Sequence, residues 1–169
     1  MEQTVRFGED SVSHLSDFLK KEKPKKIFLV SGKKSYEKCG ARSQVERELS
    51  NFDFVRFFDF EENPKIEDVE KGVRLFNENK CDLIVAVGGG SVIDIAKLVN
   101  FFKTKEKSFI NQFNSDFSKN ESCPFVAIPT TAGAGSEATH FAVVYVNKIK
   151  YSIANQNLTP NLVLINHNF

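Results

Sequence analysis

The segment DLIVAVGGGSVID at residues 82–94 joins a β-branched apolar run to three consecutive glycines. The run from Leu83 to Val87 predicts a strand buried on both faces, as in a parallel sheet covered by helices. Val92 to Phe102 predicts an apolar helix. Glycines between a strand and a helix allow the backbone to turn tightly and to approach a ligand closely. This order of elements indicates an α/β fold with a candidate site at the turn.

Short apolar runs and stretches of helical periodicity alternate on both sides of this segment. The other strands that we expect lie at Thr4 to Phe7, Ile27 to Ser31, Phe54 to Phe60, Phe125 to Ile128 and Leu162 to Ile165. The other helices that we expect lie at Ser11 to Lys20, Ala41 to Ser50 and Ile66 to Asn77, with a short helix capped by Ser35 and ending near Gly40. This alternation predicts an α/β fold with a mostly parallel, Rossmann-like sheet flanked by helices.

Three further segments are expected to lie outside that sheet. Phe141 to Val146 and Tyr151 to Ala154 are predicted to pair as a β-hairpin across Asn147-Lys148. Thr130 to Thr139 is rich in small residues and predicts a loop. Lys103 to Ser122 is polar with little periodicity, and it predicts either a surface excursion or a short irregular helix.

The overall composition excludes several classes of protein. The 169 residues are 41% hydrophobic with a formal net charge of +1, so we expect no field of one sign that would attract nucleic acid or an anionic membrane. The longest apolar runs are too short to cross a bilayer, and residues 1–10 lack the apolar core of a secretion signal. Three widely spaced cysteines indicate a reducing compartment. We expect a cytoplasmic protein that binds neither nucleic acid nor membrane.

The glycine turn is the first candidate site. Residues 88–90 lack Cβ atoms, and the helix after them presents unpaired N–H groups and the positive end of its dipole, which suit a pyrophosphate. Ser91 can cap that helix or donate to a phosphate oxygen. Asp94 is either an exposed carboxylate near the positive end of the dipole or points at a ligand hydroxyl. The alternative for the whole turn is a tight bend with an ordinary N-cap, because GGGS is not the G-x-G-x-x-G fingerprint.

The second candidate site follows the strand that ends at Ile128. Residues 129–137 read PTTAGAGSE, and small side chains and hydroxyls of this kind can lie flat against a planar or phosphorylated ligand. Ligands of parallel α/β sheets bind at the carboxyl ends of the strands, which directs attention to the turns after Ser31, Val87 and Ile128. We expect the glycine turn and the Pro-Thr-Thr segment to form neighbouring walls of one groove.

Two motifs taken together resemble a known family. Gly88 to Lys97 (GGGSVIDIAK) followed by Pro129 to Glu137 (PTTAGAGSE) is similar to the iron-type alcohol dehydrogenases, whose relatives include glycerol dehydrogenases and, more distantly, dehydroquinate synthases. The resemblance continues at Ser31 to Ser35, Asn63-Pro64, Lys150 to Ser152 and Leu158 to Leu162. It implies a dehydroquinate synthase-like N-terminal domain with a β-hairpin. It also implies binding of NAD or NADP, followed in the family by a helical domain that holds a divalent metal, iron or zinc.

The resemblance implies roles for individual residues. Gly89, Gly90 and Ser91 would hold the pyrophosphate of the cofactor, and Asp94 would face the nicotinamide side of the cleft. The residues implied along the rest of the cofactor are Asn63 near the adenine-proximal ribose, Thr130 and Thr131 on the adenosine side of the groove, and Lys150 close to the cofactor. These residues come from separate segments, so their roles depend on the groove expected above.

The turn after Ser31 bears on the choice of cofactor. NAD-preferring members of the family often place an aspartate where this chain has Gly32, and a carboxylate there accepts from the ribose hydroxyls and repels a 2′-phosphate. Gly32, Lys33, Lys34 and Ser35 instead offer room, positive charge and a hydroxyl. We hypothesise a preference for NADP(H) over NAD(H). The alternative is an exposed Lys-Lys turn without a role in binding.

The chain offers no set of metal ligands. The family uses an aspartate and three histidines of its second domain, whereas the histidines here are His14, His140 and His167, and none is at a ligand spacing. The sequence stops soon after the strand expected to end at Ile165. We expect residues 1–169 to be a single dinucleotide-binding domain, a fragment without the helical metal-binding domain.

The resemblance implies an NAD(P)-dependent alcohol or aldehyde oxidoreductase that acts on a small alcohol or aldehyde and can form a homodimer. The run from Asn63 to Lys65 is also similar to phosphonoacetaldehyde reductases. No catalytic residue is assigned, and we expect the isolated chain to be inactive. Two alternatives stay open: a non-catalytic nucleotide-binding module, and a lyase similar to dehydroquinate synthase, over which residues 129–137 favour the dehydrogenase.

Overall fold

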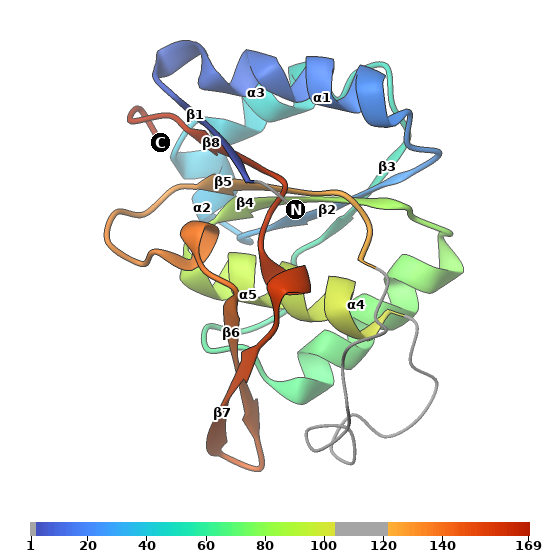
Figure 1. The fold of residues 1–169 in the computed structure, drawn as a ribbon, viewed down its shortest axis with the longest axis vertical. Coiled ribbons are helices and arrows are strands. Elements are labelled where there is room, and N and C mark those ends of the chain that lie inside the picture. Colours follow the sequence, from blue (N-terminus) through green and yellow to red (C-terminus); the bar gives the residue numbers. More distant parts are fainter. Residues whose placement is uncertain (1–2, 104–121) are drawn as a thin grey trace.

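The computed structural model describes residues 3–103 and 122–169, which form a three-layered α/β domain (Figure 1). The central sheet has six parallel strands in the order β1-β8-β5-β4-β2-β3. The strands are β1 (Thr4–Phe7), β2 (Ile27–Ser31), β3 (Phe54–Phe57), β4 (Leu83–Gly88), β5 (Phe125–Pro129) and β8 (Leu162–Ile165). The predicted parallel sheet is confirmed. The prediction for Lys103 to Ser122 lies almost entirely outside the described residues.

Helices cover both faces of the sheet. Figure 1 shows α1 and α3 on one face and α4 and α5 on the other. The helices are α1 (His14–Glu22), α2 (Ser35–Lys38), α3 (Ala41–Glu48), α4 (Ile66–Glu78) and α5 (Gly90–Phe102), with 3₁₀ turns at η1 (Glu9–Ser13), η3 (Ser136–Ala138) and η4 (Gln156–Leu158). Ile66, Val69, Val73 and Phe76 recur at helical spacing in the sequence, and in α4 they are all buried.

Alternate residues of the central strands face opposite helical layers. Phe28 and Val30 belong to the core under α4 and α5, whereas Ile27 and Leu29 belong to the core under α1 and α3. All four side chains are fully buried. Burial on both faces explains the continuous apolar runs in the sequence, because no position of such a strand faces water.

A two-stranded antiparallel hairpin, which the sequence predicted, packs against α5 and α4 and is separate from the main sheet (Figure 1). It consists of β6 (Phe141–Val146) and β7 (Ile149–Ala154). The two residues between the strands, Asn147 and Lys148, have φ angles of 49° and 68°. Two successive left-handed residues give a turn whose twist matches that of the flanking strands.

A buried lysine of α5 connects the helix to this hairpin. The Nζ of Lys97 donates to the main-chain oxygens of Thr139 at 2.6 Å and Phe141 at 2.8 Å, and to Thr139 Oγ1 at 3.3 Å. Burial lowers the pKa of Lys97 to about 8, although nearby Asp94 acts in the opposite direction. The end of the loop after β5 is therefore fixed to α5.

Several predicted boundaries are wrong by a few residues, including the start of β7, which is Ile149 and not Tyr151. Strand β3 ends at Phe57 and not at Phe60, because it is an edge strand whose pairing with β2 ends at Val30. Helix α5 begins at Gly90 and not at Val92, because the amide of Val92 already donates to the oxygen of Gly89 at 3.1 Å. Apolar side chains alone do not show where β3 ends or where α5 begins, because backbone hydrogen bonds set both boundaries.

Two predictions about helix starts are also wrong. The helix expected from Ser11 begins as the 3₁₀ turn η1, and α1 starts only at His14. Ser35 does not cap α2. Lys34 occupies the N-cap position without a side-chain hydrogen bond, and Ser35 is the first helical residue.

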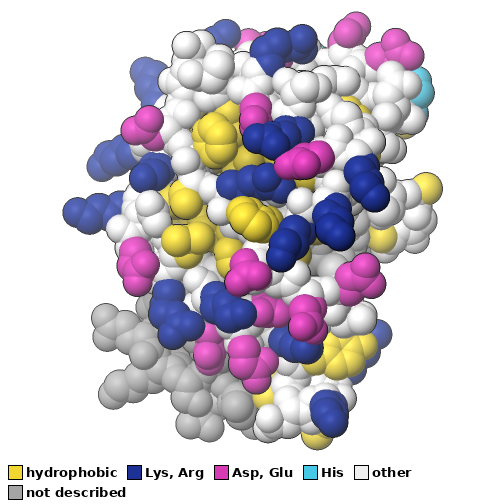
Figure 2. Space-filling model, turned by 180° about the vertical axis from the view of Figure 1, so that it is seen from behind, with side chains coloured by type: hydrophobic (Ala, Val, Ile, Leu, Met, Phe, Trp, Pro, Cys, Tyr) yellow, Lys and Arg dark blue, Asp and Glu magenta, His cyan; other side chains and the backbone are white. Residues whose placement is uncertain are grey.

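The surface carries both signs of charge. Figure 2 shows Lys and Arg side chains interspersed with Asp and Glu on the face opposite to that of Figure 1. Within residues 3–103 and 122–169, no helix is both long enough and apolar enough to pass through a membrane.

Candidate cofactor-binding site

The three turns singled out in the sequence meet at one edge of the sheet. Strands β2, β4 and β5 are neighbours, and Ser31 pairs with Val87, which pairs with Ile128. Because the strands are parallel and in register, their carboxyl ends lie side by side. This confirms the expectation that the three turns lie close together.

The glycine turn and the Pro-Thr-Thr segment are adjacent. The amide of Thr130 donates to the oxygen of Gly88 at 3.1 Å. A Cβ atom placed on Gly89 would lie 3.0 Å from Thr131 Oγ1, and one placed on Gly90 would lie 3.2 Å from Ser136 Oγ. Side chains at these two glycines would thus press on the loop after β5, and their absence brings the two segments together.

A cavity of about 600 Å³ opens along this edge. Its walls are Gly32 to Ser35 after β2, Phe60 to Asn63 before α4, Gly89 to Val92 at the start of α5, and Thr131 after β5. The predicted site residues that line it are Gly32, Ser35, Asn63, Gly89, Gly90, Ser91 and Thr131. Asp94, Thr130 and Lys150 are not among its walls. The structure thus brings most of the predicted residues together, while their binding roles stay predictions.

The start of α5 is suited to an anion. Gly89 is the N-cap residue, with an extended backbone at φ −78°, and it offers no side chain to the N–H groups of the first turn. The N–H groups of a first helical turn carry partial positive charge and bind phosphate when they face a cavity. The predicted capping role of Ser91 is wrong, since Ser91 lies inside the helix.

Ser91 instead holds the opposite wall of the cavity. Its Oγ accepts a hydrogen bond of 3.3 Å from the amide of Asn63. Asn63 has a φ of 61°, a left-handed conformation that asparagine tolerates better than most residues. The Asn63-Pro64 turn is thereby attached to the first turn of α5.

Asp94 is nearly buried beside the hairpin. Its Oδ2 accepts from the amide of Val143 at 3.2 Å, and its side chain lies within the electrostatic reach of Lys97 and Lys150. Burial raises the pKa of Asp94, whereas the bond from Val143 and the lysines oppose that rise. The alternative of an exposed carboxylate is wrong, because Asp94 is 9% exposed. The role facing a ligand stays a prediction.

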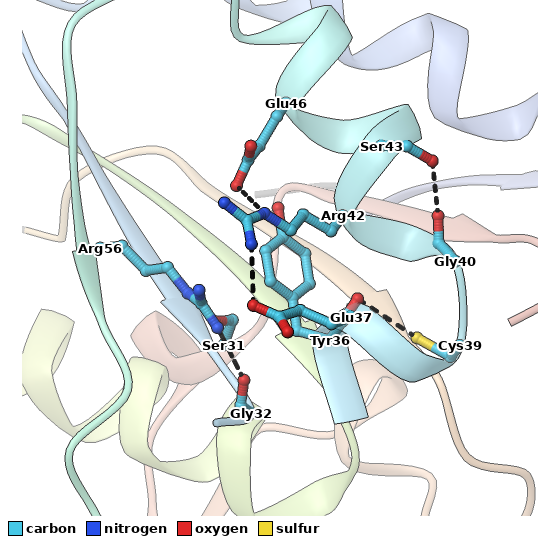
Figure 3. Close-up of polar contacts among 10 residues, drawn as sticks. All are labelled: Ser31, Gly32, Tyr36, Glu37, Cys39, Gly40, Arg42, Ser43, Glu46 and Arg56. Atoms are coloured by element: carbon cyan, nitrogen blue, oxygen red, sulfur yellow. Dashed lines mark hydrogen bonds and ion pairs between the residues drawn. The ribbon is translucent and has the colours of Figure 1, made fainter. Parts of the chain in front are cut away.

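Arg56 near the end of β3 is a polar residue at this edge that the sequence analysis did not single out. Figure 3 shows its guanidinium reaching from β3 to the turn after β2. Nε donates to Ser31 Oγ at 2.7 Å, and Nη2 donates to the oxygen of Gly32 at 3.0 Å. The available signal was an arginine inside an otherwise apolar strand, FVRF, next to a predicted binding turn.

The described residues do not form a metal site. Within residues 3–103 and 122–169, no three His, Cys, Asp or Glu side chains gather closely enough to hold a metal ion. His167 instead lies 3.3 Å from Glu9. The metal that the sequence resemblance implies does not fit the residues present, so no chemistry is assigned to a metal here.

The comparison with sequence families decides the affiliation of the chain. The sequence profile of iron-containing alcohol dehydrogenases matches residues 2–167. The chain belongs to this family. The NADPH-dependent butanol dehydrogenase of Clostridium saccharobutylicum is 33% identical over 169 residues, which cover 95% of this chain and 42% of that relative.

Solved structures of iron-containing alcohol dehydrogenases share the fold. The Thermotoga maritima member matches with a TM-score of 0.89 and 28% identity, over 99% of this chain and 47% of that structure. A sulfoacetaldehyde reductase from Bifidobacterium kashiwanohense, solved in complex with NAD+, matches with a TM-score of 0.86 and 25% identity, over 97% of this chain and 44% of its own. The chain therefore spans less than half the length of these relatives.

Proposed function

We propose that residues 1–169 form the dinucleotide-binding domain of an NAD(P)-dependent alcohol or aldehyde oxidoreductase. The observation that carries the proposal is the cavity at the start of α5, with the glycine turn and Thr131 in its walls. Its position at the carboxyl ends of parallel strands is where α/β sheets bind nucleotides. The names of two relatives, an NADPH-dependent dehydrogenase and a reductase in complex with NAD+, support the cofactor class.

The described residues would bind and orient the cofactor. The nicotinamide supplies the hydride chemistry when it is bound, and a small alcohol or aldehyde is the proposed reaction partner. Gly89, Gly90 and the first turn of α5 would hold the pyrophosphate, since these residues line the cavity and the N–H groups of a first helical turn attract phosphate. Asn63 would face the adenosine end from the opposite wall. The proposed lyase alternative has less support, because the matching family consists of alcohol dehydrogenases.

The turn after β2 supports NADP(H) as the preferred cofactor. Gly32 supplies no carboxylate, and a Cβ atom placed there would overlap Ser35 Oγ. Lys33 and Lys34 are exposed and border the same cavity. A ribose 2′-phosphate would meet positive charge at this turn and no opposing acid from it, whereas a 2′-hydroxyl would find no carboxylate acceptor.

The glycine turn provides the experiment. Gly89→Val places a β-branched side chain against Thr131 and into the cavity, so we expect NADH and NADPH to bind at least about tenfold more weakly. Ser43→Val adds the same side chain at an exposed position of α3 and serves as the matched control. Isothermal titration calorimetry measures both dissociation constants, and circular dichroism confirms that each variant is folded. Equal affinity of Gly89→Val and the control would refute the proposed site.

A further inference from the structure

Arg56 is held in a fixed position beneath the turn that borders the cavity. Its guanidinium carbon lies 4.8 Å from the ring centroid of Tyr36 and 4.8 Å from that of Phe58. The two hydrogen bonds to Ser31 and Gly32 hold the same group in place. A guanidinium stacked on aromatic rings loses less conformational entropy on binding a ligand than a free lysine does.

The charge of Arg56 is not neutralised by an acid. In the part of the chain that the structure describes, no carboxylate lies within 4.0 Å of its guanidinium. Arg42, which lies near the same Tyr36 ring, contrasts with it, because it pairs with Glu37 at 2.8 Å and with Glu46 at 3.1 Å (Figure 3). An uncompensated and half-buried cation is available to an anionic ligand group.

The hydrogen-bond inventory of Arg56 leaves donors for such a group. A guanidinium has five N–H donors in a planar fork, and the bonds to Ser31 Oγ and the Gly32 oxygen use two of them. Among the described residues, Nη1 makes no hydrogen bond, and planar pairing with phosphate oxygens is the geometry that arginine favours. Gly32 lines the cavity, and Arg56 donates to its main-chain oxygen. Arg56 therefore lies directly behind this part of the cavity wall.

We propose that Arg56 is the residue that makes the site selective for a dinucleotide with a 2′-phosphate on its adenosine ribose. The 2′-phosphate binds over Gly32, where Arg56 supplies the ordered cation and Lys33 and Lys34 supply the exposed charge. Of the two acids on the facing wall, Glu61 is paired with Lys65, and Glu62 is exposed, so that solvent screens its charge. The proposal rests on the proposed dinucleotide-binding function and adds the determinant of cofactor choice.

The experiment compares Arg56→Met with Arg42→Met, a matched loss of one arginine near Tyr36. Dissociation constants are measured by calorimetry for NADPH, NADH, adenosine 2′,5′-bisphosphate and ADP. We expect Arg56→Met to weaken NADPH and the bisphosphate by about ten- to hundredfold, which is the range for a hydrogen bond to a charged group, and to leave NADH and ADP within about threefold. Arg42→Met leaves all four constants unchanged.

Arg56→Lys guards against an effect of misfolding. It keeps the charge without the planar fork, and we expect an intermediate loss confined to the two 2′-phosphorylated ligands. Equal weakening of NADH and NADPH in both Arg56 variants would overturn the proposal, because Arg56 would then only support the turn. A wild-type protein that binds NADH more tightly than NADPH overturns it as well. Wild-type protein that binds neither dinucleotide refutes the proposed function itself, which separates the two failures.

Discussion

Gly72 lets α4 pack closely against Val99 of α5 and Phe57 of β3. A Cβ atom placed there would lie 2.6 Å from Val99 Cγ2 and 3.0 Å from Phe57 Cε1. Val99 is fully buried in α5, and a β-branched residue in a helix has one strongly preferred rotamer, so it cannot turn away cheaply. Alanine would gain about 1 kcal/mol of helix propensity but would cost about 1–3 kcal/mol through overpacking.

We therefore expect Gly72→Ala to lower the free energy of unfolding by up to about 2 kcal/mol, which corresponds to a fall in Tm of up to roughly 8 °C for a domain of this size. Val99→Ala removes the methyl group in conflict, although it is destabilising by itself. In that background, Gly72→Ala is expected to be stabilising by up to about 1 kcal/mol, because only the propensity gain and a small shift of the Phe57 ring remain. Denaturant unfolding of all four proteins measures the cycle. A Gly72→Ala effect of the same sign and size in both backgrounds would refute the packing argument.

Two further predictions concern polar groups outside the cavity. The pKa of Lys97, which burial lowers to about 8, lies below the value of about 10.4 for an unfolded lysine. Unfolding therefore takes up a proton between these two values, and Lys97 by itself should make the unfolding free energy rise with pH across that window. Burial raises the pKa of Cys81 and Cys123 to about 11, which acts in the opposite direction, so denaturant titrations at pH 7.5 and 9.5 should show the wild type gaining stability relative to Lys97→Met. The carboxylate of Asp82 accepts from the amides of Lys25 and Lys26 at 3.0–3.2 Å, so Asp82→Ala should lower the unfolding free energy by about 1 kcal/mol and Asp82→Asn by less, as measured by thermal unfolding.

The central strands could be predicted because every one of their residues is of a type suited to a buried position. Ile27 to Ser31 and Leu83 to Val87 are buried on both faces, so each position is apolar or small. The edge strand β3 gave a weaker signal. Its sequence continues with aromatic residues as far as Phe60, but its pairing with β2 stops at Phe57, and apolar character does not show where pairing stops.

The position of the site in the fold could also be predicted, whereas the hydrogen bonds made by Arg56 and Lys97 could not. Parallel topology places the turns after β2, β4 and β5 together irrespective of their sequences. The roles of Arg56 and Lys97 depend instead on partners that are distant in the chain: Arg56 bonds to residues 24 and 25 positions away, and Lys97 to residues 42 and 44 positions away. A local sequence pattern does not reveal partners that are distant in the chain, so a charged residue within it is predicted to be solvent-exposed.

The buried ammonium group of Lys97 has a mechanical consequence for the cavity. One wall of the cavity is the first turn of α5, and another is the loop that follows β5. Lys97 joins that helix to the far end of that loop through three acceptors, which restricts the movement of one wall relative to the other. A ligand entering between them meets a surface whose shape was set during folding. Little of its binding energy is then spent on ordering the protein, which favours tight binding from few contacts.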